Sequence, residues 1–198
     1  AAFAHADMQN MLREAKIAFG LSIQSIWERQ LRLYLTGCAG YLRAGEPIAE
    51  KIERANWKDL CKWFRELRNI KIEEFPSFDA LYLLHHLGNA CRHGEGASAE
   101  ALVQRCPDLW SSAGTIPPTH HMPQGSAAIT ATRQVAGMDI PVERLRMFVT
   151  AISAFWRDHE YIYNESIQRK GSHLEAKLAR ERASRAWVPQ ASHEGAVR

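Results

Sequence analysis

Apolar residues recur every three to four positions along most of the chain, and this spacing predicts a series of helices. The first covers residues 7–43, as one long helix or as two joined helices with Gly20 at the break. Gly45 and Pro47 end this segment, because neither residue continues a helix well. Residues 47–55, which follow, are polar and short.

Two amphipathic helices are predicted next. One begins near Asn56, a favourable N-cap residue, and ends before Pro76, which restricts the backbone of the residue that precedes it. The other begins near Ser77 and runs to about Arg92, where the glycines of "HGEG" end it.

The middle of the chain has weaker signals. Residues 98–110 predict a short helix that Ser98 caps and Pro107 stops. Residues 111–138 read as a long irregular loop rich in Pro, Gly, Ser and Thr, and residues 127–140 are compatible with a short hairpin.

A last core helix begins at "DIPVERL", with Asp139 or a neighbour as its cap and Pro141 in its first turn, and ends near Tyr163. Residues 172–187 have a helical composition but few core-type residues. They predict a surface helix, or a helix that forms on a partner.

The whole pattern predicts an all-α protein, with one antiparallel helical bundle over residues 1–164 and a helical or partly disordered tail over residues 165–198. The composition, 46% hydrophobic and 24% charged, is that of an ordinary globular domain. Lys and Arg balance Asp and Glu at 18 each in the bundle, so the net charge of +3 comes from the tail. This excess is too small to predict a nucleic-acid-binding block.

No apolar run approaches the roughly 20 residues that span a bilayer, and the start of the chain lacks the pattern of a signal peptide. We therefore expect no membrane association and a cytoplasmic location. The four cysteines form no C-x-x-C pair and lie among apolar residues, which favours free thiols over disulfides. They are Cys38, Cys61, Cys91 and Cys106.

A polar stripe lies within the helix predicted from Ser77, in the stretch 81–96, "LYLLHHLGNACRHGEG". Six hydrogen-bonding side chains fall within an arc of about 120° on this helix. An exposed helix face normally carries Glu and Lys, which this arc lacks. The six side chains are Tyr82, His85, His86, Asn89, Arg92 and His93.

The spacing of the stripe points to acid–base chemistry. Asn89 lies four residues from both His85 and His93, so these three side chains form one line along the helix. A histidine held by an asparagine can exchange a proton near neutral pH, and Arg92 can bind a phosphate. Cleavage of RNA without metal needs these groups, because a base removes the 2′-hydroxyl proton and a cation stabilises the charged phosphorus centre.

Two other interpretations of the stripe stay open. It can be a solvated helix face, or a metal site formed by His85, His86 and His93, with His120 or His121. The stripe contains no carboxylate, and its spacing matches no standard pattern of metal ligands. We therefore expect neither a metal nor a cofactor.

"NACRHGEG" followed by "SAEALVQRCPDLW" resembles the N-x-x-(K/R)-H-G-x-G … L-x-x-x-x-P-D-L pattern of small bacterial proteins related to the HEPN superfamily. "SIWERQLRLYL" and "AISAFWRDHEY" resemble their first and last core helices, so the resemblance covers residues 8–165. It implies an up-and-down helical bundle. Many HEPN proteins are metal-independent endoribonucleases that act as dimers in toxin–antitoxin, abortive-infection and other anti-phage systems.

The hallmark of that superfamily is an arginine, four to six residues, and then a histidine. His93 matches the histidine, but the arginine positions hold His86, Leu87 and Gly88. Arg92, or a protonated His86, is the candidate for the missing charge. Some relatives lack activity and serve as RNA-binding or assembly modules.

Two functions follow as hypotheses. The first is a metal-independent endoribonuclease or RNA-binding effector in bacterial defence, in which His93 is the general acid or base, Asn89 orients it and Arg92 contacts the scissile phosphate. His85 or His86 is the second acid–base group, Tyr82 contributes to substrate binding, and a homodimer brings two stripes together. The second is a non-catalytic assembly module that binds a partner protein through the tail at 165–187.

Overall fold

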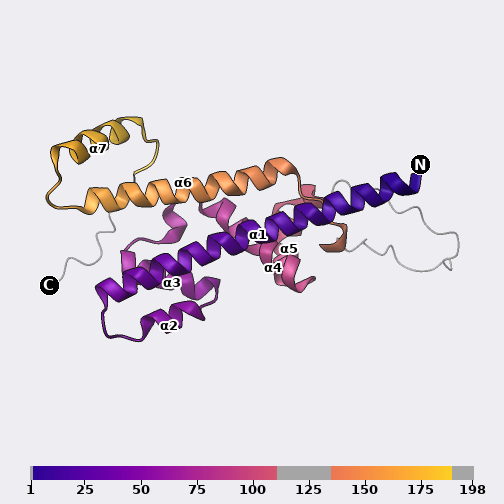
Figure 1. The fold of residues 1–198 in the computed structure, drawn as a ribbon, viewed down its shortest axis with the longest axis horizontal. Helices are drawn as coiled ribbons and strands as arrows, with labels where there is room; N and C mark the ends of the chain where they lie inside the picture. The colour runs from indigo at the N-terminus through magenta and orange to yellow at the C-terminus, as the bar shows by residue number, and fades with distance from the viewer. Residues whose placement is uncertain (1, 111–134, 189–198) are drawn as a thin grey trace. The chain divides into compact units, whose positions relative to one another are not determined.

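The computed structural model describes residues 2–110 and 135–188. These residues form seven α-helices and three short 3-10 helices, with no strand among them, so the prediction of an all-α helical bundle is confirmed (Figure 1). The α-helices are α1 (Ala2–Leu42), α2 (Ile48–Glu53), α3 (Trp57–Arg68), α4 (Phe78–His93), α5 (Ala97–Arg105), α6 (Val142–Ser166) and α7 (Ser172–Ser184). The 3-10 helices are η1 (Ile72–Glu74), η2 (Pro107–Trp110) and η3 (Val135–Gly137).

The chain divides into two compact units, and α1, α4 and α6 each contribute to both. Unit 1 contains Ala1–Ser25 and Tyr82–Phe148, and unit 2 contains Ile26–Leu81 and Val149–Arg198. Each unit is therefore assembled from segments that are distant in sequence. The predicted boundary between a bundle and a tail at residue 164 stays a prediction.

Helix α1 is one continuous helix through Gly20. A Cβ atom at Gly20 would lie 3.0 Å from Cδ2 of Leu87 and 3.3 Å from Cδ1 of Ile140. The glycine therefore permits close packing in unit 1 and does not break the helix.

Local capping signals were partly correct. The side chain of Asn56 accepts a hydrogen bond of 3.0 Å from the backbone N–H of Asp59, so Asn56 is the N-cap of α3 as predicted. The polar stretch after Pro47 differs from expectation, because it forms α2 and buries Ile48 and Ile52.

The predicted cap Ser98 is wrong, and Asp139, the first of the candidates at the start of α6, does not cap that helix. Helix α5 begins after Gly96, whose carbonyl accepts from the N–H of Glu100, and Ser98 lies inside the helix. The carboxylate of Asp139 pairs with Nζ of Lys16 at 2.8 Å, and α6 begins at Val142. In both cases a side chain expected to cap its own helix interacts instead with a residue of another helix.

The first turn of α6 is closed by Pro141, whose carbonyl accepts from the N–H of Leu145. Pro141 thus precedes the helix. Residues 127–134 of the expected hairpin lie outside the described residues, and Val135–Gly137 form η3.

The core of unit 2 is aromatic. The ring of Phe155 in α6 lies 4.9 Å from that of Trp27 in α1 and 4.6 Å from that of Phe75, measured between centroids. Further along the same two helices, the ring of Tyr34 lies 4.4 Å from that of His159. Residues later in α1 contact residues later in α6, so the two helices run parallel in unit 2. The antiparallel arrangement that we expected does not hold for this pair. Helices α2 to α5 supply the long connection that a parallel pair requires.

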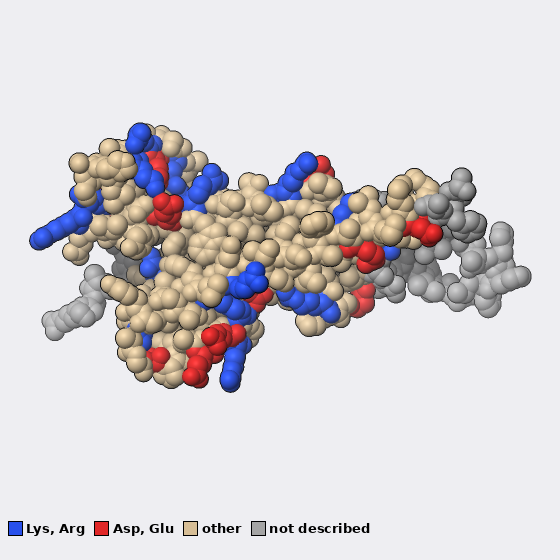
Figure 2. All heavy atoms as spheres, viewed as in Figure 1, with Lys and Arg blue, Asp and Glu red and all other residues tan. Residues whose placement is uncertain are grey.

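Helix α7 folds back beside the end of α6 in unit 2 (Figure 1). Its Leu178 is fully buried. Lys177 Nζ pairs with Glu160 at 2.7 Å and Arg182 Nε with Glu165 at 2.6 Å, and Figure 2 shows basic and acidic side chains intermixed over this helix. Of the two interpretations of residues 172–187, the structure therefore matches a surface helix of the chain itself.

The four cysteines are free thiols; Cys106 is buried and the other three are half-buried. Burial raises the pKa of Cys61 to about 12 and that of Cys91 to about 11, so both are protonated at neutral pH. Over the described residues, no helix is long and apolar enough to span a membrane.

Candidate functional site

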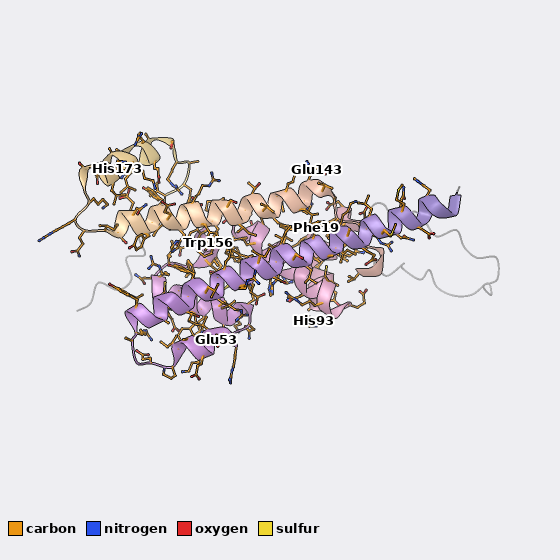
Figure 3. The ribbon with its side chains drawn as sticks, in the orientation of Figure 1. Phe19, Glu53, His93, Glu143, Trp156 and His173 are labelled. Carbon is orange, nitrogen blue, oxygen red and sulfur yellow. The ribbon has the colours of Figure 1, made fainter. Side chains whose placement is uncertain are left out.

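The polar stripe lies on α4, within unit 1 from Tyr82 onward. Leu84, Leu87 and Ala90 are buried on the opposite side of the helix. The first members of the stripe are half-buried, whereas Arg92 and His93 are exposed in the last turn. Figure 3 shows His93 at the C-terminal end of α4.

His85 and Asn89 form the hydrogen bond that their spacing predicts. Nδ2 of Asn89 lies 3.1 Å from Nε2 of His85. In the described part of the chain, no hydrogen bond joins Asn89 to His93. The structure therefore pairs the asparagine with the earlier of its two candidate histidines.

His86 is held between α4 and α5. Its Nδ1 lies 3.2 Å from Oγ of Ser98, and the edge of its ring packs on Tyr82 with centroids 4.4 Å apart. The guanidinium of Arg105 lies 5.0 Å from the centre of the Tyr82 ring. Burial, and then the charge of Arg105, lower the pKa of His86 below its ordinary value, so this imidazole is neutral at neutral pH.

Neither half-buried histidine is poised to reach a substrate in this arrangement. The rings of His85 and His86 lie 5.5 Å apart, but Nδ1 of His85 and Nε2 of His86 are buried. The other ring nitrogen of each faces Asn89 and Ser98, respectively. Sequence reasoning missed Ser98 and Arg105 because they come from α5. The period of one helix carries no signal for side chains that a second helix brings to it.

Arg92 is oriented by α1. Its Nη2 donates to Oε1 of Gln24 and, over 2.9 Å, to Oγ of Ser25. Both bonds use the same nitrogen, and this exposed side chain makes no other hydrogen bond to a described residue. Gln24 itself is 1% exposed. Sequence reasoning also missed Gln24 and Ser25.

The packing of Gln24 explains why position 88 carries no side chain. A Cβ atom at Gly88 would lie 2.5 Å from Cγ and 2.7 Å from Cδ of Gln24. The side chain of Gln24 from α1 fills the space beside position 88. The guanidinium of Arg92, one turn later on α4, binds the same glutamine.

The structure therefore divides the predicted stripe into two parts. Tyr82, His85, His86 and Asn89 form a half-buried network, whereas Arg92 and His93 form an exposed pair of sequence neighbours. Among the residues that the structure describes, no group of three or more His, Cys, Asp or Glu side chains could hold a metal ion. His120 and His121, the other candidate ligands, lie outside the described residues.

Comparison with known proteins adds no relative: no family model, no curated protein and no solved structure matches this chain. The fold and the site thus define an all-α protein in which the C-terminal end of α4 carries an arginine and a histidine.

Proposed function

We propose that this chain is a HEPN-like effector that binds RNA and cleaves it without a metal ion, in a bacterial toxin–antitoxin or anti-phage system in the cytoplasm. The observation that carries the proposal is the exposed Arg92, fixed by Gln24 and Ser25 next to the exposed His93 at the end of α4. A cation held in place before the substrate arrives stabilises developing charge better than a flexible one. The resemblance of "NACRHGEG" to the HEPN pattern supplies the substrate class.

His93 is the acid–base group of this mechanism. Its imidazole removes the proton of a ribose 2′-hydroxyl, the 2′-oxygen attacks the adjacent phosphorus, and the bond from phosphorus to the 5′-oxygen breaks. The leaving 5′-oxygen takes a proton from a second acid. Arg92 donates hydrogen bonds to the phosphate oxygens while charge develops on them.

The second acid comes from a second copy of the chain. His85 and His86 were the candidates within one copy, but both are half-buried and bonded to Asn89 and Ser98. In a homodimer, His93 of the second copy supplies an equivalent exposed imidazole. His85, His86 and Asn89 then hold α4 in position, and Tyr82 fixes the edge of the site.

Cleavage of a mixed RNA pool in excess EDTA tests this function. We expect the wild type to cleave, and His93→Ala to lower the rate by roughly 10²- to 10⁴-fold, the usual contribution of a general acid or base. His173→Ala is the matched control, because His173 is an exposed histidine on α7, in unit 2 (Figure 3). Equal cleavage by wild type and His93→Ala would rule out the assignment.

A non-catalytic assembly module is the second candidate. The burial of His85 and His86 favours it, because one copy then exposes a single histidine of the stripe. This candidate predicts a folded wild type that forms a complex with a partner protein and cleaves no RNA, alone or with that partner. The packing of α7 on α6 makes the tail a less accessible binding segment than a free helix.

A further inference from the structure

A second surface feature lies in unit 2, at the C-terminal end of α1. It is a groove of about 620 Å³, formed by the last turns of α1 with the end of α3 and a residue of α6. Binding sites for small molecules usually have volumes of about 300–1,000 Å³ and mainly apolar walls. The residues that matter for its chemistry are Leu33, Gly37, Tyr41, Leu42, Arg68 and Tyr163.

The walls of the groove are exposed apolar side chains. Tyr41 is 90% exposed and Leu33 is 68% exposed, and Leu42 and Tyr163 are more than half exposed. Single apolar side chains at a surface are ordinary, but several around one groove mark a binding surface. Leu33, Gly37 and Tyr41 lie four residues apart on one face of α1, and a Cβ atom at Gly37 would meet nothing within 4 Å. The glycine keeps the floor of the groove open.

Among the described residues, Arg68 is the one charged residue that lines the groove. Its guanidinium carbon lies 5.9 Å from the centre of the Tyr34 ring. No carboxylate of a described residue forms an ion pair with Arg68. An apolar groove with one cation that lacks a carboxylate partner is complementary to an anion with an apolar body.

Tyr34 also lines the groove, and its hydroxyl hydrogen-bonds to Nε2 of His159. Burial, and then the charge of Arg68, lower the pKa of His159 to about 4, so this imidazole is neutral at neutral pH. Arg68 therefore carries the positive charge of this region.

We propose that the groove binds a small anionic amphiphile, whose carboxylate pairs with Arg68 and whose hydrocarbon chain lies along Leu33, Tyr41 and Tyr163. This site is independent of the proposed nuclease chemistry, since all of its residues belong to unit 2. The carboxylate of the ligand supplies the anion that Arg68 lacks among the described residues. The hydrocarbon chain of the ligand covers the exposed apolar walls and so removes them from water.

Titration calorimetry with decanoate, below its micelle concentration, tests the proposal on the full chain. Decanol serves as the uncharged probe of the same length. Arg68→Gln removes the cation, and we expect it to weaken decanoate binding about tenfold or more while it leaves decanol binding unchanged. Arg68→Lys keeps the charge and retains most of the affinity.

A matched pair of glycine variants tests the location. Gly37→Leu fills the groove, and Gly40→Leu makes the same change on α1 at a residue that does not line it. Each of these glycines is exposed, lies within the helix and has open space around it. Both substitutions therefore retain or increase the stability of the helix. We expect Gly37→Leu to abolish decanoate binding and Gly40→Leu to preserve it.

Three results would overturn the proposal. They are equal binding of decanol and decanoate, decanoate binding unaffected by Arg68→Gln, and an absence of decanoate binding to the folded wild type. If the last result came with concentration-dependent self-association that Gly37→Leu removed, the groove would be a contact between copies of the chain.

Discussion

The side chain of Gln24 in α1 lies directly over the backbone of Gly88 in α4, so close that a Cβ atom there would stand 2.5 Å from Cγ of the glutamine. The same glutamine accepts a hydrogen bond from Arg92. The side chain of Gln24 thus sets how closely α1 and α4 pack at this point, and it also sets the direction of the exposed Arg92. The site at the end of α4 depends on a residue more than sixty positions earlier in the chain.

This contact predicts that Gly88→Ala destabilises unit 1. Alanine is the better helix former by about 1 kcal/mol, but the clash involves Cγ of the buried Gln24, so relieving it requires the whole side chain to shift. We expect the clash to prevail, with a net loss of about 1–3 kcal/mol in the free energy of unfolding. Urea denaturation followed by circular dichroism measures it.

Gly40→Ala is the control, because a Cβ atom there meets nothing within 4 Å. It should stabilise the protein by about 0.5–1 kcal/mol. A Gly88→Ala variant as stable as the wild type would contradict the proposed packing. The double variant Gln24→Ala with Gly88→Ala should recover part of the loss.

The environment of His86 yields a second prediction. Since the charge of Arg105 contributes to the lowered pKa of His86, Arg105→Gln should raise that pKa toward the ordinary value, though burial keeps it below. NMR titration of the histidine ring protons measures the shift. Arg146→Gln, a change at an exposed arginine of unit 1, should leave it unchanged.

Local sequence signals predicted most helices correctly, because apolar periodicity and the Asn56 cap act within a few residues. The errors arose where a tertiary partner was involved. Ser98 and Asp139 are good capping residues by type, yet His86 and Lys16, which are distant in sequence, interact with them.

In the candidate site too, the features that depend on one helix were predicted, and those that depend on a second helix were not. Helical geometry predicted which side chains of α4 share a face, and it predicted the pair of His85 and Asn89. It could not predict the direction of Arg92, because Gln24 and Ser25 of α1 determine that direction. Nor did it indicate that α1 and α6 run parallel, since periodicity carries no information on helix direction.

A third prediction concerns stability at acid pH. The pKa of His159 falls from its ordinary 6.5 to about 4 in the folded protein, so the fold favours the neutral ring. The stabilisation is complete above the unfolded pKa and is lost as pH falls from 6.5 toward 4. We expect His159 to account for a loss on the order of 2 kcal/mol across this window.

Denaturation measured at several pH values tests it. His159→Gln should flatten the decline in the free energy of unfolding between pH 6.5 and 4, because glutamine does not titrate there. Tyr34→Phe is the matched control: it removes the hydroxyl that bonds His159 but keeps the ring, so the decline should persist. If the free energy of unfolding of His159→Gln declined as much as that of the wild type, other titrating groups would be responsible for the loss of stability.

The docking of α7 gives the last prediction, which separates apolar burial from surface ion pairs. Leu178 is fully buried, so Leu178→Ala should cost about 2–4 kcal/mol in the docking of α7 and should expose its amides to exchange. Arg182→Gln removes the pairs with Glu165 and Glu175, but the arginine is 41% exposed, and such pairs contribute about 0–1 kcal/mol. Hydrogen exchange monitored by mass spectrometry resolves Ser172–Ser184 in both variants. If α7 instead lost its protection mainly in Arg182→Gln, the tail would be held by charge, and raised salt would release it in the wild type.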